Sequence, residues 1–326
     1  MGETAEIQRD DHAAVAQAPR VAPPRPPVSD AADAALRRGD FRFQIGPFAT
    51  RLALSSPLAR RDFRAIYGEY PQYPADRAVD FHLRIAPTSL LRRWVRPNAM
   101  VQAGIGNAPF VPLPADLGFL ALESAMNWMV ATTADAWLMF HAGVVARKGR
   151  AVMMPGLSGA GKSTLTAGLA VSGWRLFSDE FALLRPETGL FHPYPRPVSL
   201  KNRSIDIIAE RAGADRISRR FLKTPKGTVA YLKPPEEALR LMDVPASPAL
   251  LLFPEYRPEE RARIEELRPA ELFALTRSAS INCDRLGETA FTAIADLVAR
   301  CRGFRLFYGN LDQGMTMVGE LMERVA

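Results

Sequence analysis

The amino-acid sequence predicts an α/β protein, in which a small β-rich module precedes a larger domain of strands and helices. Apolar and polar residues alternate in the first part of the chain, as they do in half-buried strands. Further along, the apolar stretch Arg150–Pro155 leads into a glycine-rich loop. Residues 163–172 follow with apolar side chains at helical spacing. A strand, a glycine loop and a helix in direct succession are typical of α/β domains that bind phosphate groups.

Changes in composition divide the chain into three parts. Residues 1–38 contain few large apolar residues and a proline cluster at Ala22–Pro27, so we expect a disordered Pro/Ala-rich tail. Residues 39–112 form the predicted β-rich module, and Pro112 and Pro114 mark its end. Residues 113–326 form the larger domain. Within the module the alternation predicts strands at Phe41–Ile45, Arg51–Leu54 and Phe81–Ile85, and a hairpin of Trp94–Val95 with Met100–Ala103.

The larger domain has its own sequence of predicted elements. It begins with a helix at Ala115–Ala131, followed by a hairpin whose strands, Phe140–Ala146 and Ala151–Met154, flank a turn at Gly149. After the helix that follows the glycine loop, Gly173 provides a stop and Trp174–Ser178 reads as a strand. Later segments predict strands at 249–253 and 262–267, and helices at 271–278, 287–300 and 311–324.

Composition excludes several classes of protein. The longest apolar runs, such as Ala249–Phe253, are far too short to cross a bilayer. The first residues include acids and no apolar segment, so we expect no secretory signal. Cys283 and Cys301 are the only cysteines, which favours a reducing, cytoplasmic compartment over a disulfide framework. The net charge of +7 is explained by an anionic ligand, so we expect neither a nucleic acid nor a membrane as partner.

Residues 156–163, Gly-Leu-Ser-Gly-Ala-Gly-Lys-Ser, form a complete P-loop, or Walker A motif. Glycines let the backbone approach phosphate oxygens closely, and N–H groups at the start of the following helix can surround them. Lys162 would reach the β- and γ-phosphates of ATP, and the Ser163 hydroxyl would ligate Mg²⁺. A glycine-rich turn without a ligand is the alternative. The ATP-binding residues expected are Gly156, Leu157, Ser158, Gly159, Ala160, Gly161, Lys162, Ser163 and Thr164.

An acidic pair, Asp179 and Glu180, follows the next predicted strand, 17 positions after Lys162. This spacing leaves room for one helix, a turn and a strand, so we expect the pair at the carboxyl end of the neighbouring strand, beside the phosphates. Adjacent strand residues point to opposite faces, so the pair must lie where the strand ends and bends. One acid could accept a hydroxyl proton while the other binds metal. A helix cap or solvated turn is the alternative.

Two further residues are candidates for catalysis. His141 begins the hairpin strand that runs beside the P-loop strand, and a structural and a functional histidine are equally compatible with that place. Arg196, in the segment Pro195–Asn202, could bind a transferring phosphoryl group through two N–H groups, with Lys201 as a nearby charge. The alternative for Arg196 and Lys201 is that both are ordinary surface cations.

These segments together resemble the HPr kinase/phosphorylase family. The resemblance depends on His141-Ala-Gly, the loop Gly156–Thr164, the segment Gly173–Glu180 and the segment Arg196–Asn202. Within the family the chain is most similar to the branch called HprK-related kinase A, in which we also expect Lys226–Val229, Leu232–Pro235 and Ile281-Asn282.

The resemblance implies a PEP-carboxykinase-like P-loop fold and ATP-dependent phosphorylation of a protein or peptide hydroxyl. It assigns Asp179 as general base, Glu180 as the neighbouring acid and His141 as the hairpin histidine. The chain differs from the family at two places: Glu180 stands where the family usually has Asp, and no Glu-Ile-Arg-Gly signature follows, with Arg196 as its substitute. Neither the HPr substrate nor a phosphorylase reaction therefore follows.

The sequence thus predicts a kinase that uses ATP and Mg²⁺ to phosphorylate a Ser/Thr hydroxyl of an unidentified protein or peptide. The predicted catalytic residues are Asp179, Lys162, His141 and Arg196, and the predicted metal ligands are Ser163 and Glu180. Three alternatives stay open: a nucleotide-sensing P-loop module, an ATPase without kinase activity, and a small-molecule kinase. Association into a homo-oligomer stays open as well.

Overall fold

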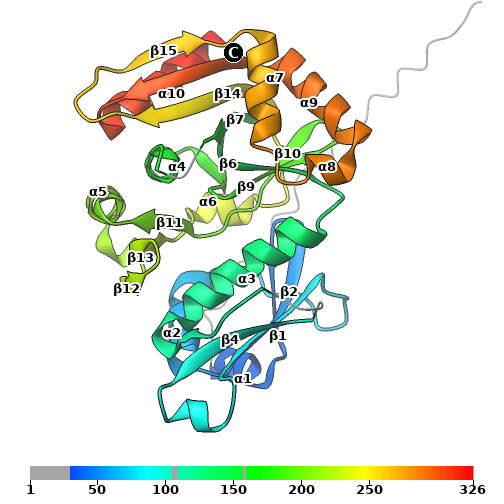
Figure 1. Cartoon of the computed structure of the whole chain (residues 1–326), viewed down its shortest axis with the longest axis vertical. Coiled ribbons are helices and arrows are strands. Elements are labelled where there is room, and N and C mark those ends of the chain that lie inside the picture. Colours follow the sequence, from blue (N-terminus) through cyan, green and yellow to red (C-terminus); the bar gives the residue numbers. More distant parts are fainter. Residues whose placement is uncertain (1–29, 105–108, 157–158, 326) are drawn as a thin grey trace, which may run out of the picture.

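The structure, a computed structural model, describes residues 30–104, 109–156 and 159–325. Three sheets organise this part of the chain: one of five strands, one of eight and one of three. Helices cover the sheets, and the predicted α/β class is confirmed (Figure 1). Residues 1–29, most of the predicted tail, lie outside the described residues, as do Leu157 and Ser158 of the predicted ATP site.

The five-stranded sheet carries the N-terminal module. Its strands lie in chain order: β1 (Phe41–Ile45), β2 (Phe48–Leu54), β3 (Phe81–Ala86), β4 (Asn98–Ala103) and β5 (Leu113–Pro114). The first three confirm the predicted strands. The predicted hairpin is wrong, because β4 pairs antiparallel with β3 and Trp94 follows a short 3-10 turn, η1 (Leu91–Arg93). Three helices belong to the module: α1 (Asp30–Arg38), α2 (Pro57–Tyr67) and α3 (Gly118–Thr133).

Helix α1 corrects the expected extent of the tail, since residues 30–38 are ordered. Leu36 is fully buried and Ala32 nearly so, both in the core beneath β1 and β2. The first turn carries Asp30 and Asp33 and the last turn Arg37 and Arg38, which is the favourable arrangement for the helix dipole. Two buried apolar residues, Ala32 and Leu36, are enough to anchor this helix to the core. The average composition of residues 1–38 does not reveal them.

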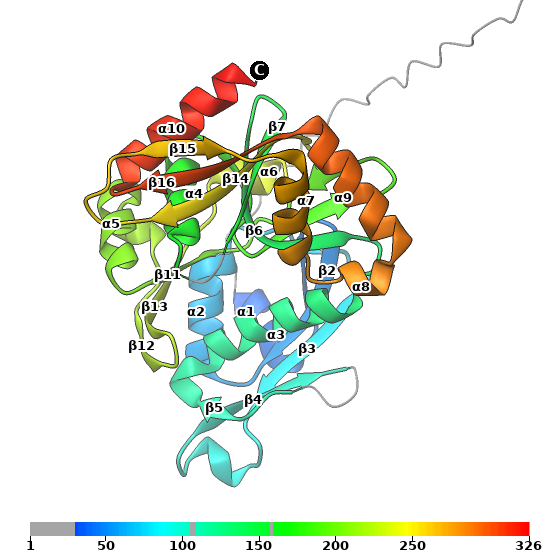
Figure 2. The same cartoon turned by 45° about the horizontal axis from the view of Figure 1, so that its top comes forward.

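Helix α3, which the prediction places at the start of the larger domain, packs against the N-terminal sheet. Its apolar residues Phe119, Leu122, Met126 and Met129 are buried in the same core as β1–β4. Figures 1 and 2 show α3 crossing the face of the five-stranded sheet. Pro114, which marks the predicted end of the module, lies in β5, and β5 pairs with β4.

The eight-stranded sheet forms the centre of the larger domain. Its order is β10-β9-β6-β7-β14-β16-β15, with β8 also paired to β6. The hairpin β6–β7 is antiparallel, whereas β7, β14 and β16 are parallel to one another. The strands are β6 (Leu138–Arg147), β7 (Arg150–Pro155), β8 (Arg175–Ser178), β9 (Phe181–Arg185), β10 (Leu190–His192), β14 (Ser247–Tyr256), β15 (Arg263–Glu266) and β16 (Arg302–Tyr308).

Helices cover both faces of this sheet (Figure 2). Helices α4 (Lys162–Val171) and α10 (Leu311–Arg324) lie on one face, and α7 (Pro269–Ser278), α8 (Cys283–Leu286) and α9 (Glu288–Arg300) on the other. Along β7, Val152 and Met154 pack on the α4 side and Ala151 and Met153 on the α9 side. A strand buried on both faces carries an unbroken apolar run, which is why Arg150–Pro155 could be recognised.

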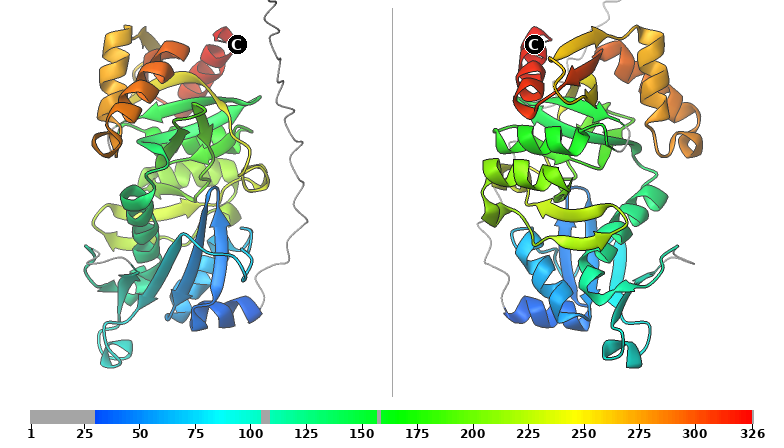
Figure 3. Two further views of the ribbon diagram at one scale, coloured as in Figure 1. Left: turned by 90° about the vertical axis from the view of Figure 1, so that its right-hand side faces the viewer. Right: turned by 60° about the vertical axis from the view of Figure 1, so that its left-hand side comes forward.

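A three-stranded sheet lies between the two larger parts, as Figures 1 and 3 show. Its order is β11 (Val198–Lys201), β13 (Gly227–Leu232), β12 (Phe221–Thr224), and α5 (Arg203–Ala212) and α6 (Glu236–Arg240) flank it. Phe221 and Tyr231 pack in the N-terminal core, whereas Ala230 and Leu232 of the same hairpin pack in the core around α4. The hairpin therefore joins both cores.

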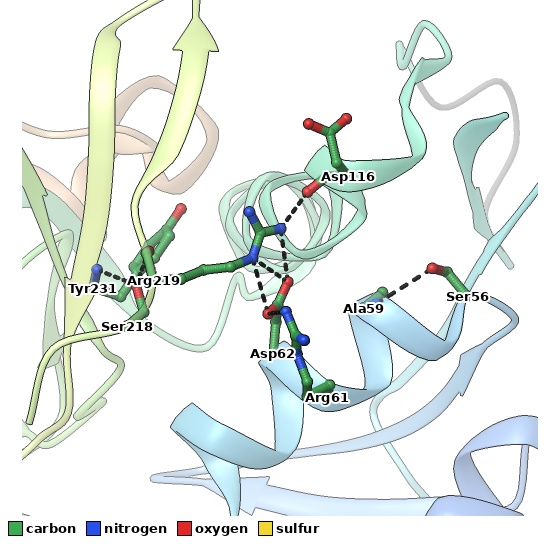
Figure 4. Close-up of polar contacts among 8 residues, drawn as sticks. All are labelled: Ser56, Ala59, Arg61, Asp62, Asp116, Ser218, Arg219 and Tyr231. Carbon is green, nitrogen blue, oxygen red and sulfur yellow. Dashed lines mark hydrogen bonds and ion pairs between the residues drawn. The ribbon is translucent and has the colours of Figure 1, made fainter. Parts of the chain in front are cut away.

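An ion pair fixes this hairpin to α2 (Figure 4). The Nε of Arg219 donates to both carboxylate oxygens of Asp62 at 3.0 Å, and its Nη2 donates to the carbonyl oxygen of Asp116 at 2.5 Å. Asp62 is 6% exposed, so the guanidinium compensates a largely buried carboxylate. The segment that leads into β12 is thus anchored to the N-terminal module at this point.

Candidate functional site

The glycine loop joins the end of β7 to the start of α4, as predicted. Gly159 and Gly161 have positive φ angles of 93° and 85°, which side-chain-bearing residues rarely adopt. A Cβ on Gly161 would lie 2.3 Å from the Tyr308 hydroxyl oxygen. The ends of two neighbouring strands hold the loop: the Tyr256 N–H donates to the Ala160 carbonyl at 3.1 Å, and the Tyr308 hydroxyl donates to the Gly161 carbonyl at 3.2 Å.

Lys162, the first residue of α4, is only 5% exposed. Its ammonium group donates to the carbonyl oxygen of Gly156 at 3.1 Å, across the mouth of the loop. Burial lowers the pKa of Lys162, against the opposite effect of Asp179 and Glu180. The lysine is therefore folded over the loop that it would serve, within electrostatic reach of both acids.

Asp179 and Glu180 lie between β8 and β9, where the chain leaves one strand and enters the next. The expected bend is confirmed, but the expected strand neighbour is wrong: β6 lies between β8 and β7. Both β8 and β7 are antiparallel to β6, so they run in the same direction and end at the same edge of the sheet. The acids and the loop meet there because of this shared direction.

Gly143 of β6 allows helix α4 to lie close to the sheet between the loop and the acids. A Cβ at this position would lie 2.1 Å from the Thr166 Oγ1 atom of α4. The Thr166 side chain of the helix thus packs directly against the backbone of the strand at Gly143. This contact explains why the third residue of the His141-Ala-Gly segment is a glycine: a larger residue would collide with Thr166.

The Asp179 carboxyl is 6% exposed, and its Oδ1 atom has no hydrogen-bond partner among the described residues. Burial raises the pKa of Asp179 to about 7, and the charge of Glu180 adds to this effect. Lys162, the Ser163 side chain and Lys201 act in the opposite direction. A buried acceptor without a donor is unfavourable in a resting protein and is typical of a group that meets a ligand.

Asp179→Asn is expected to stabilise the metal-free protein at pH 8, by roughly 2–4 kcal/mol. The folded-state pKa of about 7 lies above the ordinary value of 3.8, so the folded protein holds a proton that the unfolded chain has lost. The wild-type protein therefore loses stability as the pH rises through this window. Urea unfolding at pH 5 and pH 8, with chelator, measures the difference.

The expected gap between Asp179→Asn and wild type is small at pH 5 and large at pH 8. Asp284→Asn, whose side chain is 94% exposed, serves as control and should show no such gap. A gap of equal size at both pH values would contradict the raised pKa of Asp179.

His141 contacts Glu180. Its Nδ1 atom lies 3.2 Å from the Glu180 carbonyl oxygen and 3.7 Å from the Oε1 carboxylate atom. Burial, followed by the charge of Lys162, lowers the pKa of His141. A neutral imidazole that donates from Nδ1 to the carbonyl keeps Nε2 as an acceptor. The predicted histidine thus does lie at the site, half-exposed and beside the second acid.

Arg196 is not available at the site in the way that its spacing predicted. Its guanidinium is 5% exposed and bonds to the Glu123 carboxylate, to the Asn127 side chain and to the Glu123 carbonyl at 3.0 Å. The Tyr67 hydroxyl donates to the other oxygen of Glu123 at 2.6 Å. Arg196 therefore connects α3 to the loop before β11, and the predicted phosphoryl contact is corrected to a structural one.

Sequence reasoning missed the groups that surround the loop. Tyr256 and Tyr308 end β14 and β16, and the parallel order that brings them to Gly161 is a property of the fold. Lys201, which the sequence did indicate as a nearby charge, lies at the end of β11. It affects the pKa values of Asp179, Lys162 and His141, so it joins Lys162 as a cation near the acids. Each tyrosine is the last residue of an apolar strand, 247–256 or 302–308, and this position was the only sign in the sequence that could have indicated them.

The donor set fits Mg²⁺ held through a nucleotide. Among residues 30–104, 109–156 and 159–325, no three His, Cys, Asp or Glu side chains converge as a metal cluster. Mg²⁺ needs no such cluster, because it is commonly bound by one or two carboxylates, phosphate oxygens and water. Glu180 and the Ser163 hydroxyl supply oxygen ligands of the required kind, beside the buried Asp179 carboxyl, whose Oδ1 has no hydrogen-bond partner among the described residues.

The chain matches no model of a known protein family and no curated protein. No helix in the described part of the chain is long and apolar enough to span a membrane.

Proposed function

We propose that this protein is an ATP-dependent kinase of the HPr kinase/phosphorylase type, with a PEP-carboxykinase-like P-loop domain. One observation carries the proposal: the carboxyl of Asp179 is buried, and its Oδ1 has no hydrogen-bond partner among the described residues, at the sheet edge where the glycine loop and Lys162 also lie. A P-loop alone serves many ATPases. A buried carboxylate next to the P-loop, with one oxygen available to accept a proton, suits an enzyme that removes a proton from a hydroxyl.

The reaction follows from the roles of the side chains. The loop residues and Lys162 bind the phosphates of ATP, and the lysine leaves its contact with the Gly156 carbonyl to do so. Asp179 accepts the proton of a Ser/Thr hydroxyl on a protein or peptide as the acceptor oxygen bonds to the γ-phosphorus. The bond from that phosphorus to the bridging oxygen breaks, and ADP leaves. Mg²⁺, when bound by Ser163 and Glu180, would neutralise phosphate charge.

Electrostatics account for most of the expected rate. Lys162 and Lys201 lie within electrostatic reach of Asp179 and provide positive charge where the transferring phosphoryl group would be. His141 lies beside Glu180, with its Nδ1 atom 3.2 Å from the Glu180 carbonyl oxygen and 3.7 Å from the Glu180 carboxylate. Holding the acceptor and the phosphate in line then contributes by positioning.

Incubation with γ-labelled ATP and Mg²⁺ in a cell lysate tests the proposal. Wild type, Asp179→Asn and the surface control Asp284→Asn are compared. A labelled protein or peptide seen with wild type and Asp284→Asn, but not with Asp179→Asn, supports a kinase and identifies its acceptor. Labelled free phosphate alone would favour an ATPase. A labelled small molecule would favour a small-molecule kinase, and bound nucleotide without product a nucleotide sensor.

Lys162→Ala is expected to weaken ATP binding roughly 10- to 100-fold, because a charge-assisted contact to phosphate is lost. Titration calorimetry with a non-hydrolysable ATP analogue measures the change. Lys148→Asn is the control, since Lys148 is exposed on the β6–β7 turn and Asn tolerates its positive φ of 51°. Equal affinities of Lys162→Ala and Lys148→Asn would exclude the proposed phosphate site.

A further inference from the structure

Four strongly exposed apolar side chains of the N-terminal module lie together on one protruding loop, residues 87–97 between β3 and β4, here named the tip. Leu90 is 79% exposed, Leu91 65%, Trp94 84% and Val95 52%. Leu91 and Trp94 are three residues apart in and just after η1, so they project from the same side of the turn. Large apolar residues gathered in this way mark a surface that contacts something else.

The tip is an ordered loop. The Asn98 side chain closes its base: its Oδ1 accepts from the Thr88 N–H at 3.0 Å and its Nδ2 donates to the Thr88 hydroxyl at 3.0 Å. Inside the loop, the backbone N–H of Trp94 donates to the Leu91 carbonyl at 3.1 Å. The apolar side chains are therefore held outward by a structured turn.

The charge around these side chains has one sign. The tip contains Arg92, Arg93 and Arg96, and none of the three forms an ion pair with a described residue. No Asp or Glu occurs anywhere between Asp80 and Asp116. Elsewhere most arginines of the described chain have acidic partners, for example Arg219 with Asp62. The tip thus combines exposed Leu and Trp with uncompensated positive charge.

The position of the tip restricts what can cover it. Figures 1, 2 and 3 show this cyan segment at the far end of the N-terminal module, beyond the edge of the sheet. Because the loop projects, all its apolar side chains can contact an extended flat surface at the same time. Leu90, Leu91 and Val95 cannot stack on nucleobases, which disfavours a nucleic acid. Trp at the interface, aliphatic residues in the acyl region and Arg at the headgroups match a lipid bilayer.

We propose that the tip binds peripherally to the surface of a membrane with anionic lipids. Leu90 and Leu91 reach the acyl region and Trp94 lies at the interface. Arg92, Arg93 and Arg96 pair with lipid phosphates and carboxylates. The expectation of no membrane partner came from the net charge of the whole chain, which does not show how positive charge is concentrated in the tip. The proposal is independent of the kinase reaction, since the tip contributes no residue to the nucleotide site.

Sedimentation of the full-length protein with vesicles tests this. Vesicles of phosphatidylcholine with 30% phosphatidylserine are compared with phosphatidylcholine alone. We expect binding to the first and little to the second. Leu91→Ser with Trp94→Ser should lower the partition constant at least tenfold. Arg92→Ser with Arg93→Ser should lower it roughly 20- to 30-fold, since each arginine near an anionic surface contributes about fivefold.

Controls separate the tip from general adhesion. Phe291→Ser removes an apolar side chain that is 58% exposed on α9 and should leave binding unchanged. Trp94→Phe should bind vesicles as wild type does but lose the blue shift of tryptophan emission. Sedimentation of wild type and both tip variants to the same extent would overturn the proposal. So would tip-dependent binding of single-stranded DNA or polyglutamate with no binding to anionic vesicles.

Discussion

Asp179→Asn is expected to lower the rate of phosphoryl transfer about a thousandfold, in the middle of the range for loss of a general base. The amide keeps the shape of the side chain but cannot take the proton from the substrate hydroxyl. Nucleotide affinity should change by no more than a few-fold, because the loop and Lys162 are untouched. Single-turnover transfer to the labelled acceptor measures the rate, and calorimetry measures the affinity.

Asp284→Asn is the matched control, an Asp-to-Asn change on a side chain that is 94% exposed. The Asp179 variant should also be at least as stable as wild type at pH 8, so a loss of activity could not be attributed to unfolding. Turnover by Asp179→Asn at the wild-type rate would exclude Asp179 as base, although the P-loop could still bind ATP.

Arg196→Met is expected to lower the free energy of unfolding by about 3–5 kcal/mol. The change leaves the Glu123 carboxylate buried without its cation; both side chains of the wild-type pair are only 6% exposed. Glu123 also accepts from Tyr67, so the remaining charge has one hydrogen bond left. Urea unfolding measures the loss.

Two comparisons separate this effect from the removal of any arginine. Arg302→Met breaks the exposed pair with Glu266 and should lower the free energy of unfolding by less than about 1 kcal/mol. Glu123→Gln combined with Arg196→Met should recover part of the loss, since no buried charge remains. If Arg196→Met and Arg302→Met were equally stable, Arg196 would not have the structural role assigned here.

Local patterns in the sequence predicted the local parts of the site. Gly149, Gly161 and Gly173 adopt the positive φ angles that a turn, a glycine loop and a helix stop require. The apolar stretch at 150–155 and the helix after the loop are where the patterns placed them. These features depend on neighbours within a few residues, so periodicity and turn chemistry suffice for them.

Contacts between distant segments could not be predicted in this way. Arg196 follows the acids by 17 positions and has the chemistry of a phosphate ligand, yet its partner is Glu123 on a helix 73 residues earlier. The strand order that inserts β6 between β7 and β8 likewise depends on pairing across the sheet. Function at the level of the acceptor stays a proposal, because nothing in the octapeptide or the acid pair specifies one.

The support of the glycine loop also has a consequence for the order of protein synthesis. Gly161 bonds to Tyr308, and α4 packs against α10, so the last strand and helix of the domain complete the site. A nascent chain halted before residue 302 already contains the whole octapeptide 156–163 but not the tyrosine that bonds to Gly161. ATP use should therefore begin only after translation of the C-terminal segment, and ribosome-stalled chains of graded length would show when.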